Sequence, residues 1–115
     1  MQILIVDDEP VELFLAKKIL NMEFKAEGFN TLPEALQWAK TNSFDVLLSD
    51  YYLDKQLHAI DVLRTLLDLK GKSFKSFVLT NFIDESKVAE IISAGFNGVI
   101  EKPLTLEKFK SKVGL

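Results

Sequence analysis

The residues of this sequence with the clearest chemical potential are five polar side chains at or just after the ends of short apolar runs: Asp7, Asp8, Asp50, Thr80 and Lys102. Aspartate carboxylates are preferred ligands of hard divalent cations such as Mg²⁺. An aspartate can also act as a nucleophile toward a phosphoryl group, whose oxygens a lysine and a hydroxyl can stabilise. The residue types therefore point to metal-assisted phosphoryl chemistry.

Each of these residues, taken alone, has an ordinary structural explanation. Asp8, before Glu9 and Pro10, is typical of a turn or a helix N-cap. Thr80 alone would be a strand-end threonine, and Lys102 alone a solvated loop lysine. All five polar residues, however, fall at the same end of successive predicted strands, and this combination favours one shared site.

The strands that would position these residues are predicted from unbroken apolar runs, which are typical of strands buried on both faces of a parallel sheet. Four such runs cover residues 3–6, 46–48, 77–79 and 99–100. A weaker segment at residues 26–30 is expected to be a fifth strand at an edge. The carboxyl ends of parallel strands form a crevice, so the five polar side chains should converge there.

Helices are predicted between the strands, where apolar residues recur at helical spacing. In the first helix, the predicted core face consists of Val11, Phe14, Leu15 and Ile19. The other helices are predicted around residues 33–42, 60–67, 84–94 and 105–113. Because strand and helix alternate five times, the sequence predicts a three-layer α/β fold, with one domain spanning residues 1–115.

Three carboxylates in one crevice repel one another unless a cation lies among them. Mg²⁺, which accepts oxygen ligands and keeps several waters, is the simplest candidate. Lys102 adds a fixed positive charge and Thr80 a hydroxyl donor, so the same crevice suits a phosphoryl group attached to one carboxylate.

Composition excludes several other kinds of function. The sequence has no cysteine, which rules out thiol catalysis and cysteine zinc sites and agrees with a reducing cytoplasm. A net charge of −3 without basic clusters argues against non-specific nucleic-acid binding. The first apolar run is too short for a signal peptide or a membrane span. His58, the only histidine, is expected to be inert.

In order along the chain, Asp7-Asp8, Leu47-Leu48-Ser49-Asp50, Leu79-Thr80 and Glu101-Lys102-Pro103 resemble the motifs of bacterial response regulator receiver domains. The resemblance covers essentially the whole chain, and the full set at these spacings is specific. It implies a flavodoxin-like fold with a five-stranded parallel sheet in the order 2-1-3-4-5.

The resemblance also implies a role for each matching position. Asp50 resembles the aspartate that takes a phosphoryl group from a histidine kinase. Asp8 resembles the direct Mg²⁺ ligand, Asp7 a ligand acting largely through water, and the backbone carbonyl of Tyr52 a further ligand. Thr80 and Lys102 resemble the residues that contact the phosphoryl group. Lys102-Pro103 resembles a cis peptide that the family usually contains.

The sequence departs from the family pattern around these motifs. Val99 stands where receivers usually carry a switch aromatic, and Asn81 where a small residue is common. The loop at residues 54–59 lacks Pro and Gly and is one residue longer than usual. These departures concern signal propagation rather than the phosphorylation chemistry.

We also hypothesise that Tyr52, Asn81 and Phe82 limit the approach of water to a phosphorylated Asp50 and so slow the loss of its phosphoryl group.

The sequence therefore predicts a phospho-accepting signalling switch, whose only catalysis is its own phosphotransfer and autodephosphorylation. Two alternatives are a pseudo-receiver that binds partners without phosphorylation and a small Mg²⁺-dependent phosphohydrolase. The expected partners are a histidine kinase or phosphotransfer protein and a downstream protein or output domain that the sequence does not name. Residues 84–94, 98–101 and 105–113 are the expected switch surface and a candidate surface for phosphorylation-dependent dimerisation.

Overall fold

The computed structural model describes residues 1–51, 58–81 and 84–115. Strands and helices alternate there in the predicted order. Their bounds are β1 Gln2–Val6, α1 Pro10–Leu20, β2 Lys25–Phe29, α2 Leu32–Ala39, β3 Val46–Asp50, α3 Ala59–Lys70, β4 Lys75–Thr80, α4 Glu85–Ser93, β5 Gly98–Glu101 and α5 Leu106–Val113. No helix within the described residues is both long enough and apolar enough to cross a membrane.

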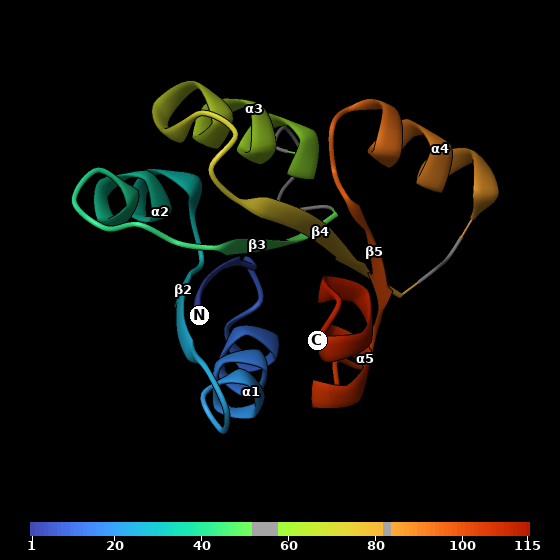
Figure 1. Ribbon diagram of the computed structural model, residues 1–115, viewed down its shortest axis with the longest axis horizontal. Helices are drawn as coiled ribbons and strands as arrows, with labels where there is room; N and C mark the ends of the chain where they lie inside the picture. Colours follow the sequence, from blue (N-terminus) through green and yellow to red (C-terminus); the bar gives the residue numbers. More distant parts are fainter. Residues whose placement is uncertain (52–57, 82–83) are drawn as a thin grey trace.

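The five strands form one parallel sheet in the order β2-β1-β3-β4-β5, which confirms the predicted flavodoxin-like topology. α1 and α5 lie on one face of the sheet, and α2, α3 and α4 lie on the other (Figure 1). β2 is an edge strand, as expected, and its Lys25 and Glu27 are exposed.

Side chains of the central strands enter two hydrophobic clusters, one on each face of the sheet. Ile3 and Ile5 of β1 join the cluster that contains α1 and α5, whereas Leu4 and Val6 join the cluster that contains α2 and α3. All four are fully buried, and burying each contributes on the order of 2 kcal/mol relative to exposure. This burial on both faces fixes β1 in the sheet, so Asp7 emerges at its carboxyl end.

The face of α1 that packs on the sheet differs from the predicted one. α1 packs through Leu13, Ala16 and Leu20, which also have helical spacing. The predicted core face was wrong, because Val11 and Phe14 are 63% and 61% exposed. Apolar residues occupy both sides of this helix, so periodicity alone could not identify the buried one.

A close approach between α1 and β2 explains which side is buried. A Cβ atom on Gly28 would lie 2.4 Å from Leu13 Cδ1, a distance that real Cβ atoms do not reach. The missing side chain of Gly28 therefore leaves room for Leu13 against β2. Glycine at this position provides space rather than an unusual backbone conformation, and a larger residue would force the end of the Leu13 side chain to shift.

The first turn of α1 is fixed at the carboxyl edge of the sheet by capping. The Glu9 side chain accepts hydrogen bonds from the backbone N–H groups of Val11 and Glu12, at 3.2 Å and 2.7 Å. Pro10 occupies the first turn, where its missing N–H costs nothing. Glu12 is consequently held beside the residues that follow β1.

Candidate functional site

The predicted site residues meet where the strands end. β1 ends directly before Asp7, β3 and β4 end in Asp50 and Thr80, and β5 ends directly before Lys102. One carboxylate oxygen from each of Asp7, Asp8 and Asp50 lies within 4.8 Å of the other two. The structure therefore brings together the three acidic residues that the sequence placed in one crevice.

The three carboxylates have different surroundings. Asp7 is buried, and its Oδ1 accepts a hydrogen bond from the backbone N–H of Glu9 at 3.0 Å. Asp50 is partly buried, and its Oδ1 accepts one from the backbone N–H of Tyr51 at 3.1 Å. Asp8 is exposed, so the cluster is open to solvent on its side. This oxygen-only donor set, open on one side, fits Mg²⁺ and the waters that it retains.

Burial raises the pKa of two of these carboxyl groups. It raises the pKa of Asp7 from 3.8 to about 7, against the lowering effect of the backbone N–H of Glu9. The negative charges of Asp50 and Glu12 add to this increase in the pKa of Asp7. Burial also raises the pKa of Asp50, although the hydrogen bond from Lys102 opposes it. Ionisation of these carboxyl groups is therefore unfavourable without a cation, and a bound divalent ion would favour their ionised form.

Lys102 connects Asp50 to a residue that the sequence reasoning missed. Its Nζ donates to Asp50 Oδ1 at 3.0 Å and to Glu12 Oε2 at 2.6 Å. Burial alone would lower the pKa of Lys102, but the Glu12 and Asp50 carboxylates raise it above its usual value. The ammonium therefore keeps its charge at the site. The sequence carries no local signal for this role of Glu12, because its importance depends on a contact with Lys102, 90 residues away.

The remaining predicted residues of the phosphorylation motifs have clear positions. The backbone carbonyl of Thr80 accepts a hydrogen bond from the backbone N–H of Lys102 at 2.8 Å, which joins the ends of β4 and β5. The Lys102–Pro103 peptide bond is cis, as the resemblance implied. The motif residues of β4 and β5 are thus adjacent in the folded protein.

The structure describes some of the predicted switch and access residues. Val99 is 5% exposed and belongs to the cluster on the side of α2, α3 and α4. Asn81 is exposed at the end of β4. Tyr52, Phe82 and most of the loop at residues 54–59 lie outside the described residues.

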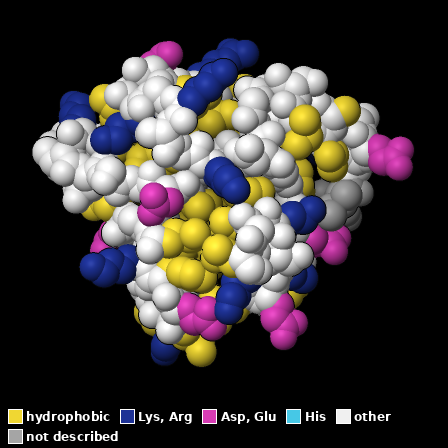
Figure 2. Space-filling model, in the orientation of Figure 1, with side chains coloured by type: hydrophobic (Ala, Val, Ile, Leu, Met, Phe, Trp, Pro, Cys, Tyr) yellow, Lys and Arg dark blue, Asp and Glu magenta, His cyan; other side chains and the backbone are white. Residues whose placement is uncertain are grey.

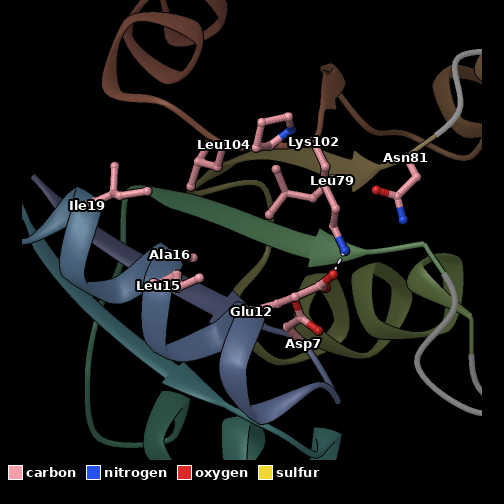
Figure 3. A pocket seen from close by; sticks show the side chains of 10 residues that line it. Asp7, Glu12, Leu15, Ala16, Ile19, Leu79, Asn81, Lys102 and Leu104 are labelled. Atoms are coloured by element: carbon pink, nitrogen blue, oxygen red, sulfur yellow. Dashed lines mark hydrogen bonds and ion pairs between the residues drawn. The ribbon is translucent and has the colours of Figure 1, made fainter.

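A cavity of about 300 Å³ opens beside Lys102, between α1 and the segment after β5 (Figure 3). Its polar lining consists of Asp7, Glu12, Asn81 and Lys102, and its apolar walls of Leu15, Ala16, Ile19, Leu79, Pro103 and Leu104. Figure 2 shows hydrophobic side chains gathered in the middle of this face of the molecule, beside α1 and α5. Lys102 is the only cationic side chain among the described residues that line the cavity.

Comparisons with known proteins agree with this geometry. The chain is 30% identical to chemotaxis protein CheY-3 of Vibrio cholerae over 98% of its own length and 88% of that protein. It is 29% identical to chemotaxis protein CheY of Pseudomonas aeruginosa, covering 98% of this chain and 93% of that one. These relatives match nearly the whole chain.

A solved structure shows the same fold. The CheY-like receiver domain protein of Methanospirillum hungatei superposes with a TM-score of 0.81 at 27% identity, covering 98% of this chain and 93% of that one. The model of the family described as "Response regulator receiver domain" matches residues 3–114. The chain belongs to the family of response regulator receiver domains.

Proposed function

We propose that residues 1–115 form one receiver domain that takes a phosphoryl group onto Asp50 with the help of Mg²⁺ and thereby switches a partner-binding surface. The position of the Asp50 carboxylate carries this proposal. It contacts Lys102 Nζ at 3.0 Å and shares the acidic cluster with Asp7 and Asp8. A carboxylate nucleophile, a cation-binding cluster and a fixed ammonium in one crevice suit phosphoryl transfer.

In the proposed reaction, a carboxylate oxygen of Asp50 attacks the phosphorus of a phosphohistidine. The new O–P bond forms as the P–N bond breaks, and the imidazole, protonated on its other ring nitrogen, takes the electron pair and leaves as a neutral ring. Mg²⁺, if held by the acidic cluster, would supply positive charge that offsets the negative charge of the phosphoryl group. Lys102 holds one of these oxygens through its ammonium, and the Thr80 hydroxyl donates a hydrogen bond to another. The products are an acyl phosphate on Asp50 and a free histidine on the donor.

Asp8, Asp50 and Asp7 are the proposed protein ligands of the metal. The exposed position of Asp8 suits a direct ligand that approaches the ion from the solvent side. The buried position of Asp7 suits a ligand that acts largely through water. The backbone carbonyl of Tyr52 completes the proposed set, as the family resemblance implies.

The proposed output is a change in the surface formed by α4, β5 and α5. The backbone hydrogen bond between Thr80 and Lys102 connects the site to β5, and Thr80 is proposed to reorient when Asp50 carries a phosphoryl group. Val99 takes the place of the usual switch aromatic, so the proposed change would reach this surface without the movement of an aromatic ring. The surface formed by α4, β5 and α5, where Ile92 is 46% exposed, is also the proposed site of phosphorylation-dependent dimerisation. The proposed donor of the phosphoryl group is a histidine kinase or phosphotransfer protein in the cytoplasm.

Incubation with acetyl phosphate and Mg²⁺ tests the proposed function. We expect intact-mass spectrometry to show one added phosphoryl group per chain, which is then lost slowly. Absence of labelling would identify a pseudo-receiver. Continuous release of phosphate over many turnovers would identify a phosphohydrolase instead.

Mg²⁺ is expected to raise the melting temperature of the wild-type protein by roughly 5 °C at about ten times its dissociation constant. Asp8→Ala should remove most of this rise, because the metal loses its solvent-side ligand. Since Asp8 is exposed, the substitution should leave the core intact. Asp68→Ala, at an exposed position of α3, is the control. Equal stabilisation of wild type and Asp8→Ala would place the ion elsewhere.

A further inference from the structure

Glu12 holds the lysine that the proposed phosphorylation needs. The contact between Lys102 Nζ and Glu12 Oε2 is 2.6 Å long, shorter than the 3.0 Å contact between Lys102 Nζ and Asp50 Oδ1. Figure 3 shows the Glu12 side chain reaching from α1 to the end of Lys102. The ammonium is therefore shared between two carboxylates, only one of which is the proposed phosphoryl acceptor.

The backbone positions of both partners favour this ion pair. Glu12 lies in the first turn of α1, which Glu9 caps, and its own backbone N–H is held by the Glu9 carboxylate. Lys102 is tied by its backbone N–H to Thr80. The Lys102 side chain is only 12% exposed, so this pair is more shielded from water than an ordinary surface ion pair.

A phosphoryl group on Asp50 would bring more negative charge to a place where Glu12 already contributes one. The oxygens of Glu12 and Asp50 both lie within hydrogen-bond distance of the same nitrogen, so the two carboxylates are close neighbours. Among the described residues lining the adjacent cavity, no second cationic side chain can neutralise Glu12 if Lys102 turns toward the phosphoryl oxygens. Like charges at such a separation repel.

We propose that Glu12 is a positioning residue that restrains phosphorylation of Asp50 by competing for Lys102. This inference rests on the proposed function and adds a control of its rate. The Glu12 side chain is 41% exposed and can rotate toward the solvent when Lys102 moves to the phosphoryl group. The competition between Glu12 and the phosphoryl group therefore slows phosphorylation without blocking it. Formation of the acyl phosphate then includes the transfer of Lys102 from Glu12 to a phosphoryl oxygen.

Glu12→Gln tests the proposal, because the amide keeps the length of the side chain and removes its charge. With acetyl phosphate and Mg²⁺, we expect this variant to be phosphorylated roughly 3- to 30-fold faster than wild type. Its dissociation constant for beryllofluoride, a mimic of the phosphoryl group, should fall by a similar factor. Glu12→Asp keeps the charge and should stay closer to wild type. Glu27→Gln, on exposed β2, controls for the change in net charge.

A double-mutant cycle in metal-free protein measures the competition without phosphorylation. Urea denaturation in the presence of a chelator compares wild type, Glu12→Gln, Lys102→Ala and the double variant. Glu12→Gln should lower the free energy of unfolding in the wild-type background, where it removes an ion pair. It should raise this free energy in the Lys102→Ala background, where Glu12 only repels Asp7 and Asp50.

The outcomes separate this inference from the proposed function. If wild type is labelled and Glu12→Gln is labelled at the same rate or more slowly, the restraint by Glu12 is overturned while the receiver function stands. An additive cycle would also overturn the restraint, because the two side chains would then not be coupled. If wild type takes up no phosphoryl group, the proposed function fails and this inference fails with it.

Discussion

Replacing Asp50 with asparagine is expected to reduce phosphorylation by acetyl phosphate at least about 1000-fold, to below detection. The amide has no carboxylate oxygen to attack phosphorus. Neither neighbouring aspartate is placed to replace it, because Asp7 is buried and Asp8 lies on the solvent side of the cluster. Intact-mass spectrometry after incubation with Mg²⁺ and the donor measures the effect.

The structure predicts that the Asp50→Asn protein remains folded, so its inactivity would be informative. Glu12 lies 2.6 Å from Lys102 in the wild-type protein, so Lys102 should retain this partner in the variant and should not be left as an unpaired charge. Asp68→Asn, at an exposed position of α3, is the matched control and should be labelled like wild type. Labelling of Asp50→Asn at the wild-type rate would show that the acceptor is another residue.

The stability of the metal-free protein is expected to fall by roughly 2–4 kcal/mol as pH rises from about 4 to about 7. The pKa of Asp7 is raised by burial from 3.8 to about 7, so the folded state binds a proton that the unfolded state releases near pH 4. The stabilising effect of this proton is fully present below the unfolded pKa. It is lost as pH rises through the folded pKa of Asp7. Asp50, whose pKa burial also raises, adds to the same slope.

Urea denaturation in a chelator, repeated across this pH range, tests the role of Asp7. Asp7→Asn should be more stable than wild type near pH 8 and should lose most of the pH dependence, because the amide does not ionise. Saturating Mg²⁺ should reverse much of the loss in wild type, since the ion favours the charged carboxylate. An unchanged slope in Asp7→Asn would assign the pH dependence to other groups.

The order of the strands and helices could be predicted because strands buried on both faces leave unbroken apolar runs. Residues 3–6 are such a run, and each of them is fully buried. The buried face of α1 could not be predicted, because apolar residues lie on both sides of that helix. The space beside Gly28 of β2 accommodates Leu13, and this contact is visible only once α1 and β2 are packed together.

The carboxylate cluster could be predicted because Asp7 and Asp50 are placed by the ends of neighbouring parallel strands. Glu12 could not be assigned in this way. Its importance depends on a contact with Lys102, which is 90 residues away in the chain. A charged residue in the first turn of a helix is usually a solvated one, and only the position of Lys102 distinguishes Glu12 from that ordinary case.

The character of β2 has a consequence for how the folded protein resists aggregation. An open strand edge is a template on which another chain can form hydrogen bonds and extend the sheet. β2 presents the charged side chains of Lys25 and Glu27 at one edge, and β5, at the other, is only four residues long. Short or charged edges discourage such strand addition, so copies of this chain should associate through their helices rather than edge to edge.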